Sequence, residues 1–389
     1  MRVAVNVEQL LHDSPGGIGR YTARLVSLLP TLFPGDEVVA FAARHSTDAL
    51  RAAAEGAGLA GGGRGIVSLP LPRPLLYDAW HVLGLPPLIA AGGGLRGVDV
   101  VHAPSVAVPP GSRVPLVVTV HDVAPALYPE SFSRRGRRFH AQGLAAVARR
   151  ADLVIAVSEA AADEIVRHST IPAGRIRVVP NGLDAVEVTE ARRRATLARF
   201  GLGDAPYVLW VGSLEPRKGV GTLVAAMARL GAGAPAGRPP EAPRLVLAGY
   251  PGWLSDGLID PGDRAVLGDR LRQLGRVGEA DLWGLYAGAT VFAFPSRHEG
   301  FGLPVLEAMS QRVPVVCSEI PALREVAGDA ARFVPPGAVG AWCEALGDLL
   351  GDEGARAHLA TAGHARSRGF SWDRTVRATH RLYDEVASG

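Results

Sequence analysis

The sequence predicts an α/β protein with more than one domain. Short apolar runs such as residues 207–211 and 291–294 alternate with longer amphipathic stretches. This pattern is typical of buried parallel strands that are joined by helices. Loops that contain glycine follow several of these runs. The chain has 389 residues, which exceeds the usual size of one domain. We therefore expect two domains of roughly 190 residues each.

Composition and charge exclude several classes of protein. Hydrophobic residues make up 48% of the chain and charged residues 20%, which excludes a disordered protein. The formal net charge of +3 is too small to indicate a nucleic-acid partner. No apolar run approaches the ~18 residues of a membrane-spanning helix, and the first residues resemble a strand, not a signal peptide. Cys317 and Cys343 lie in apolar surroundings, so we expect buried thiols and a cytoplasmic protein.

The start of the chain has the order strand, glycine loop, helix. Residues 2–7 are expected to form the strand, 12–19 the loop and 20–29 the helix. This order presents backbone N–H groups and the positive end of a helix dipole to an anion. The third glycine of a dinucleotide-binding turn is missing and the loop is too long, which disfavours a NAD-dependent oxidoreductase. The candidate residues for anion binding are the glycines of the loop, Gly16, Gly17 and Gly19.

Two later apolar runs end in histidines, His102 and His121. In doubly wound sheets, ligands bind at the carboxyl ends of the strands, where both side chains are expected. A single histidine is more often structural, but two at matching strand ends indicate a site. We favour His121, which is followed by Asp122.

Other stretches leave alternatives open. Residues 133–150 are strongly basic, and either form a solvated cationic face or dock an anionic lipid or a polyanionic acceptor. The proline-rich stretch 70–87 either lines an acceptor site or forms a surface helix. The stretches 51–65 and 231–238 are rich in glycine and alanine and are expected to contain loops.

Arg217 and Lys218 form a strong anion-binding signal. They follow the strand at 207–211 and lie at the amino-terminal end of a helix expected at 220–230. Cations at this end oppose the helix dipole, and an anion that both of them bind removes the conflict. Lys218 is the only lysine among 41 basic residues, which suggests that a compact ammonium group is needed there.

The stretch 290–309 has the same organisation. An apolar strand at 291–294 is followed by a loop with two glycines, and Pro304 suits the start of the next helix. Glu299 and Glu307 have seven residues between them. A carboxylate accepts two hydrogen bonds side by side, so it suits the vicinal hydroxyls of a sugar. The simpler alternative is that Glu307 complements the helix dipole and Glu299 is solvated.

Taken as a whole, the string Glu299-Gly-Phe-Gly-Leu-Pro-Val-Leu-Glu307 resembles the E-x7-E motif of retaining glycosyltransferases of family 4, which have the GT-B fold. The segment Gly212-Ser-Leu-Glu-Pro-Arg217-Lys218-Gly219 resembles the segment of the same family that begins with glycine and ends in Arg-Lys-Gly. The resemblance implies two facing Rossmann-like domains: residues 1–185 for the acceptor and 186–371 for the donor. It also implies that the last helix, 372–389, crosses back to the first domain.

The resemblance assigns roles residue by residue. Arg217 and Lys218 would hold the donor diphosphate, Glu307 the ribose hydroxyls, and Glu299 the transferred sugar. The residues expected to take part in catalysis are Arg217, Lys218, Glu299 and His121. The expected donor-binding residues are Gly17, Gly212, Arg217, Lys218, Arg276, Val277, Glu299, Gly300, Phe301, Gly302, Leu303 and Glu307. The expected acceptor-binding residues are Gly16, Gly19, His121 and Asp122.

The implied reaction moves a hexosyl unit from a nucleoside diphosphate sugar to an acceptor hydroxyl. GDP-mannose is the favoured donor, with UDP-glucose, UDP-N-acetylglucosamine or a dTDP-deoxysugar as alternatives. The acceptor would be a carbohydrate, a lipid-linked sugar or a small molecule. The chain has no Asp-x-Asp, so we expect no metal and no cofactor. A nucleotide-sugar epimerase and a non-catalytic binding protein remain alternatives, as does weak contact with the inner face of the membrane.

Overall fold

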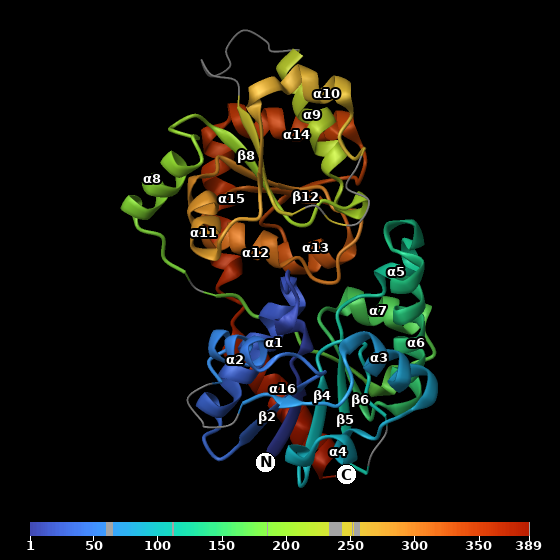
Figure 1. Cartoon of the computed structure of the whole chain (residues 1–389). Helices are drawn as coiled ribbons and strands as arrows, with labels where there is room; N and C mark the ends of the chain where they lie inside the picture. The colour runs from blue at the N-terminus through green and yellow to red at the C-terminus, as the bar shows by residue number, and fades with distance from the viewer. Residues whose placement is uncertain are drawn as a thin grey trace. The chain divides into compact units, whose positions relative to one another are not determined.

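The computed structural model divides into two compact units (Figure 1). It describes residues 1–59, 65–110, 113–184, 186–232, 243–250, 252 and 257–388, so the loops expected within 51–65 and 231–238 lie largely outside the described residues. Unit 1 comprises residues 1–129, 134–182 and 371–389, and unit 2 comprises 130–133 and 183–370. The border at Gly182 and Leu183 lies three residues before the border expected from the sequence.

Unit 1 contains a parallel sheet whose strands, within the described residues, have the order β3-β2-β1-β4-β5-β6-β7. Each central strand is buried on both faces, which explains why its sequence is apolar throughout. The order reverses between β1 and β4, so the loops that leave these two strands diverge to opposite faces. The strands are β1 Arg2–Asn6, β2 Glu37–Ala42, β3 Val67–Ser68, β4 Val100–Ala103, β5 Leu116–Val120, β6 Leu153–Ala156 and β7 Ile176–Val178.

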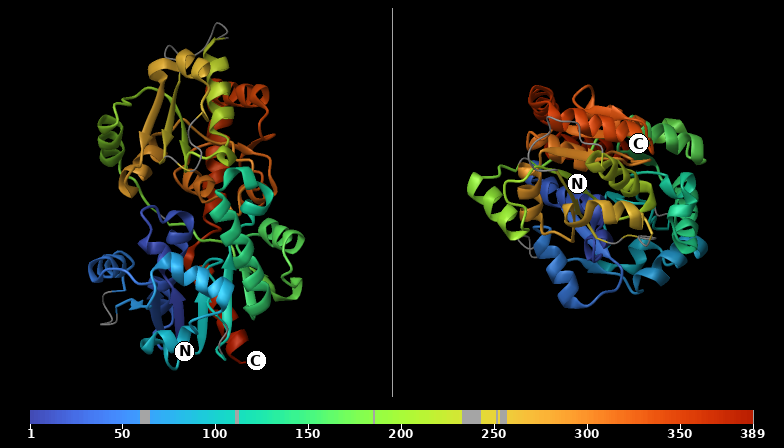
Figure 2. Two further views of the ribbon diagram at one scale, coloured as in Figure 1. Left: turned by 45° about the vertical axis from the view of Figure 1, so that its right-hand side comes forward. Right: turned by 90° about the horizontal axis from the view of Figure 1, so that it is seen from above.

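Helices cover both faces of this sheet. The α-helices of unit 1 are α1 Gly16–Leu32, α2 Thr47–Gly56, α3 Arg73–Asp78, α4 Leu88–Ala91, α5 Ala124–Leu127, α6 Arg134–Arg150, α7 Glu159–His168 and α16 Trp372–Ala387, and a π-helical segment, η3, spans Ala79–Leu83. The last helix of the chain, α16, packs against α1 and β4. Its side chains Trp372, Val376 and Tyr383 belong to the core of unit 1. The left view of Figure 2 shows α16, in red, among the elements of unit 1. This confirms that the final helix returns to the first domain.

The amino-terminal end of α16 is set by Ser371. Its side-chain oxygen accepts a hydrogen bond from the backbone N–H of Arg374, which is the usual role of an N-cap serine. The hydroxyl of Thr375 then donates to the carbonyl of Pro180 at 2.7 Å, which ties the helix to the end of the preceding segment of unit 1.

Unit 2 contains a second parallel sheet, with the order β10-β9-β8-β11-β12-β13 among the described strands. The order reverses between β8 and β11. Trp210 of β8 and Trp342 are fully buried in its core. The strands are β8 Tyr207–Val211, β9 Arg244–Ala248, β10 Leu271–Gly275, β11 Val291–Phe294, β12 Val315–Ser318 and β13 Arg332–Val334. The helices are α8 Glu190–Arg199, α9 Val220–Ala232, α10 Pro261–Leu267, α11 Glu279–Gly288, α12 Leu303–Ser310, α13 Pro321–Ala327, α14 Val339–Gly351 and α15 Glu353–Ser367.

One local expectation was wrong, and one simpler alternative does not hold. The glycines at 16, 17 and 19 lie in the first turns of α1 and not in a loop. Pro15 precedes them with φ −62° and ψ −29°, so its ring already sets a helical backbone. Glu307 is the fifth residue of α12, beyond the first turn, so it does not complement the dipole there. None of the described helices is long and apolar enough to cross a membrane.

Candidate active site

Two loops of unit 2 form a polar cluster at the point where the strand order reverses. One loop follows β8 and spans residues 212–219, and the other follows β11 and spans 295–302. Because β8 and β11 are paired neighbours, both loops leave the same edge of the sheet. Ligands of doubly wound sheets bind outside this edge.

Three charged side chains meet between these loops. Lys218 Nζ lies 2.6 Å from Glu299 Oε1, and Arg217 Nη1 lies 3.8 Å from Glu299 Oε2. The same Arg217 nitrogen donates to the carbonyl of His298 at 2.9 Å. The three side chains are only 10–14% exposed. Two cations therefore share one largely buried carboxylate.

A close backbone approach holds the loops together. Gly219 has φ +69°, and a Cβ atom at this position would lie 2.1 Å from the carbonyl oxygen of Pro295. Only glycine fits there, which gives the glycine of the Arg-Lys-Gly segment a structural reason. The N–H of Arg297 also donates to the carbonyl of Arg217 at 2.8 Å.

The charges set the protonation of Glu299. Burial raises the pKa of this carboxyl, but the charges of Lys218 and Arg217 outweigh that effect and hold the pKa below its usual value. Glu215 adds a second carboxylate, with Oε2 at 3.3 Å from Arg217 Nη2 and Oε1 accepting from Ser213 at 2.6 Å. Glu299 is thus a carboxylate at neutral pH and neutralises the cations locally.

Glu307 lies on the buried side of α12 and is 4% exposed. The hydroxyl of Tyr286, which is fully buried in α11, donates to Glu307 Oε2 at 2.7 Å. This bond fixes the rotation of the carboxylate. The structure therefore places Glu307 and Glu299 in different surroundings, one bonded to a phenol and one paired with cations.

The residues between the glutamates contribute mainly backbone. Phe301 is 5% exposed, and its ring packs edge-on against Phe370 at 5.9 Å, so its side chain belongs to the core. Gly302 has φ +112° and precedes α12, and a Cβ atom there would lie 2.5 Å from Leu323. Gly300 is buried and Leu303 is the first residue of α12.

The remaining donor candidates of unit 2 lie at the same sheet edge. Gly212 follows β8. A Cβ atom on Gly249 would lie 1.6 Å from the carbonyl oxygen of Gly212, so the two backbones pass close together. Arg276 and Val277 follow β10, two strands from β8; Arg276 is exposed and Val277 half-buried.

The glycine candidates of unit 1 lie at the start of α1, after β1. Gly16 and Gly17 are exposed, whereas Gly19 is buried against Pro15. A Cβ atom on Gly19 would lie 2.2 Å from Pro15 Cβ, so Gly19 is needed for the turn itself.

The two histidines of unit 1 have different surroundings. His102 bonds Thr119 through Nε2 at 2.8 Å and Tyr383 through Nδ1 at 2.6 Å. Burial lowers the pKa of His102 to about 3, so it is a neutral core residue. His121 is half-buried and donates through Nε2 to the carbonyl of Pro104 at 3.0 Å, and burial also lowers its pKa. Asp122 accepts from the N–H of Ala124, the first residue of α5, at 2.9 Å.

Sequence reasoning missed Glu215 and Tyr286. Glu215 stands inside the quoted loop, two residues before Arg217, and a search for carboxylates near the cations would have found it. Tyr286 lies in a separate helix, and nothing in its local sequence indicates its contact with Glu307. Among the described residues, no group of three or more His, Cys, Asp or Glu side chains is placed to hold a metal ion.

Comparisons with known proteins identify the family. Residues 15–187 match the family described as Glycosyltransferase Family 4, and residues 205–352 match Glycosyl transferases group 1. An O-antigen chain mannosyltransferase B from Escherichia coli is 32% identical over 372 residues, which cover 94% of this chain and 95% of that protein. This chain belongs to glycosyltransferase family 4. As a family 4 enzyme it is a hexosyltransferase with the GT-B fold.

Two further comparisons concern a second curated relative and a solved structure with the same fold. A D-inositol 3-phosphate glycosyltransferase from Xylanimonas cellulosilytica is 32% identical over 291 residues, 70% of this chain and 67% of that protein. Among solved structures, the Anabaena protein HepE in complex with UDP and glucose has a TM-score of 0.73 at 18% identity and covers 99% of this glycosyltransferase and 100% of its own chain.

Proposed function

We propose that this glycosyltransferase moves a hexosyl unit from a nucleoside diphosphate sugar to an acceptor hydroxyl, with retention at the anomeric carbon and without a metal. The observation that carries the proposal is the convergence of Arg217 and Lys218 on Glu299 at the reversal point of the unit 2 sheet. Two fixed cations in a poorly solvated place form a site for a diphosphate.

The geometry supports an exchange of partners when the donor binds. Glu299 is the anionic partner of Lys218, at 2.6 Å. The donor diphosphate would take over the two cations, and Glu299 would turn its oxygens to the sugar hydroxyls. Glu307, held by Tyr286, would accept from the ribose hydroxyls.

In the reaction, the bond between the anomeric carbon and the diphosphate oxygen breaks, and a bond from the same carbon to the acceptor oxygen forms. The proton of the acceptor hydroxyl passes to the leaving phosphate. Negative charge grows on the diphosphate in the transition state, and Arg217 and Lys218 stabilise that charge. This is the charge that a metal would otherwise neutralise.

GDP-mannose is the proposed donor because the mannosyltransferase from Escherichia coli matches nearly the whole chain. UDP-glucose is the alternative, because HepE has the same fold and was solved with UDP and glucose. UDP-N-acetylglucosamine and dTDP-deoxysugars complete the set of donors. For the acceptor, we propose a carbohydrate hydroxyl.

The test measures release of nucleoside diphosphate from each donor in EDTA, together with the shift in melting temperature. It compares the wild type, Lys218→Ala and the control Arg332→Ala, whose side chain is 59% exposed on β13. We expect one donor to be used without metal. Lys218→Ala should lose about two to three orders of magnitude in turnover, as when one donor to a developing oxyanion is removed. The control should behave as the wild type.

Other outcomes would contradict the proposal. If a divalent metal is needed for turnover, the two cations do not replace it. If Lys218→Ala binds donor less tightly but neither protein turns it over, the site is a sensor. An inverted anomeric product in NMR spectra of the transferred sugar would exclude retention.

A further inference from the structure

The segment from Leu75 to Leu85 exposes a cluster of large apolar side chains. Four side chains of this segment are more than half exposed: Leu75 at 58%, Val82 at 56%, Leu83 at 70% and Leu85 at 55%. Among the described residues, only two other large apolar side chains are comparably exposed, Val166 and Val266, and each stands alone in the sequence. Single exposed apolar residues are ordinary, whereas a cluster marks an interaction surface.

This segment is firmly attached to unit 1 by its other side. Leu76 and Trp80 are fully buried. Arg150 of α6 donates through Nη2 to the carbonyl of Trp80 at 3.0 Å, and the ring of Phe139 stacks on Tyr77 at 5.6 Å. The segment is therefore apolar on its buried side and apolar again on its outer side.

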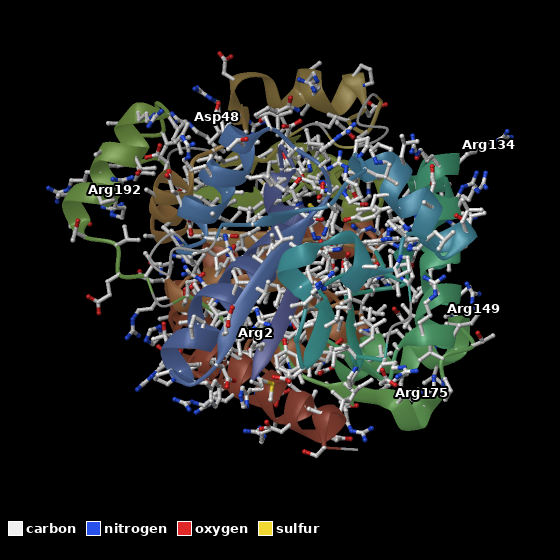
Figure 3. All side chains as sticks on the ribbon, turned by 60° about the horizontal axis from the view of Figure 1, so that its bottom comes forward. Arg2, Asp48, Arg134, Arg149, Arg175 and Arg192 are labelled. Atoms are coloured by element: carbon white, nitrogen blue, oxygen red, sulfur yellow. The ribbon has the colours of Figure 1, made fainter. Side chains whose placement is uncertain are left out.

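The neighbouring helix α6 carries a strong positive charge. Its sequence contains six arginines and no acidic residue. Arg134, Arg135, Arg137, Arg138 and Arg149 are exposed. Figure 3 shows Arg134 and Arg149 pointing away from the body of the protein. Asp78, the one acidic residue of the sequence 73–85, lies 3.6 Å from Arg135, so one charge of the helix is locally compensated.

The histidine of this segment does not add charge. His81 is buried, and burial followed by the charge of Arg150 lowers its pKa to about 4, so its ring is neutral near pH 7. The charge of the region thus comes from α6 arginines, and it does not vary near neutral pH.

We propose that the four exposed apolar side chains of Leu75–Leu85, together with the arginines of α6, form a docking surface for an anionic lipid bilayer. Apolar side chains that enter the headgroup boundary and cations that meet anionic headgroups are the two components of interfacial membrane binding. A second copy of the chain would bring two sets of α6 arginines together, which repel each other. A soluble polyanion would satisfy the arginines but leave the apolar side chains in water.

This inference goes beyond the proposed transferase reaction and does not depend on it. A docked enzyme would reach acceptor hydroxyls that are attached to lipids. The α6 helix lies outside the donor-binding loops, so donor binding and membrane binding can be measured separately.

The test is co-sedimentation of the full chain with vesicles of phosphatidylcholine alone or mixed with phosphatidylglycerol. We expect binding to the mixed vesicles only, weakened by salt. One variant combines Leu75→Ser, Val82→Ser, Leu83→Ser and Leu85→Ser, and should bind at least tenfold more weakly. Its control combines Val166→Ser and Val266→Ser, which remove exposed valines elsewhere, and should bind as the wild type.

A second variant combines Arg134→Ser, Arg137→Ser and Arg138→Ser and should bind about a hundredfold more weakly. Its control removes three charges from unit 2, with Arg192→Ser, Arg194→Ser and Arg332→Ser. In all variants the GDP-dependent or UDP-dependent shift in melting temperature should match that of the wild type, which separates this test from that of the transferase.

A third measurement keeps the proposal testable if the fourfold serine variant does not fold. Leu83→Trp should lose fluorescence with lipids brominated on the acyl chain, and Val166→Trp should not. Failure of the wild type to bind anionic vesicles would overturn the proposal. So would equal binding by the serine variant, or concentration-dependent dimers that vanish in that variant without any vesicle binding.

Discussion

Removing Lys218 should destabilise unit 2 because Glu299 would lose its nearest cation. The two side chains are 14% and 10% exposed, and their charged atoms are 2.6 Å apart. Breaking a buried ion pair typically costs about 3–5 kcal/mol. Arg217 remains 3.8 Å from the carboxylate and compensates in part. We therefore expect Lys218→Ala to cost about 2 kcal/mol, which for a unit of this size lowers the melting temperature by about 6 °C.

A double-mutant cycle with Glu299→Gln isolates the interaction. We expect a coupling free energy of about 2 kcal/mol from urea unfolding at pH 7. The control cycle uses Arg177 and Glu385, which are 2.8 Å apart but 41% and 47% exposed. An exposed pair should give no more than about 0.5 kcal/mol, because water screens it. Equal coupling in the two cycles would refute the reasoning that burial makes the first pair strong.

The pH dependence supplies a second check. Burial raises the pKa of Glu299, but the charges of Lys218 and Arg217 lower it by more than burial raises it. The folded-state pKa therefore lies below the ordinary value of 4.5. The stability that Glu299 contributes is therefore present above about pH 4.5 and is lost as the pH falls through the folded-state pKa. The difference in stability between the wild type and Lys218→Ala should be full at pH 7 and shrink in acid. A difference that grows towards low pH would contradict this assignment.

Three further predictions concern single contacts. Tyr286→Phe removes the hydroxyl that donates to Glu307. The donor KM should rise with a smaller change in kcat, and the free energy of unfolding should fall by about 2 kcal/mol. An unchanged KM would show that the phenol does not position the carboxylate. Gly219→Ala places a methyl group against the carbonyl of Pro295. It should lower the free energy of unfolding in urea by more than about 1 kcal/mol and weaken donor binding. A variant as stable as the wild type would mean that the two loops can separate. Ser371→Ala removes the cap of α16 and should cost about 1 kcal/mol without changing donor affinity, as melting with and without donor would show.

Much of the fold could be predicted from local patterns. The apolar run Val291–Phe294 became a central strand because a parallel strand is buried on both faces and needs no polar side. The α16 helix starts one residue after Ser371, because a serine side chain can replace the missing helical acceptor there. The start of α1 was wrong because three glycines suggested a loop, whereas Pro15 had already set the helical backbone.

The chain by itself also determined which residue types follow the strands: a solitary Lys218 after Arg217, and two glutamates with seven residues between them, glycines among those seven. The sequence alone supplies this chemistry, because cations bind anions and carboxylates bind hydroxyls in any fold.

Only the tertiary structure decided which partners they take. Lys218 and Glu299 are 81 residues apart and meet because β8 and β11 are neighbours where the strand order reverses. Tyr286 reaches Glu307 because α11 and α12 pack together. The sequence did not predict that Leu83 is exposed. A segment that is apolar on both sides carries no pattern that shows which side faces the core. Hydrophobic patterning is local, whereas contacts between distant residues depend on how the sheet orders its strands.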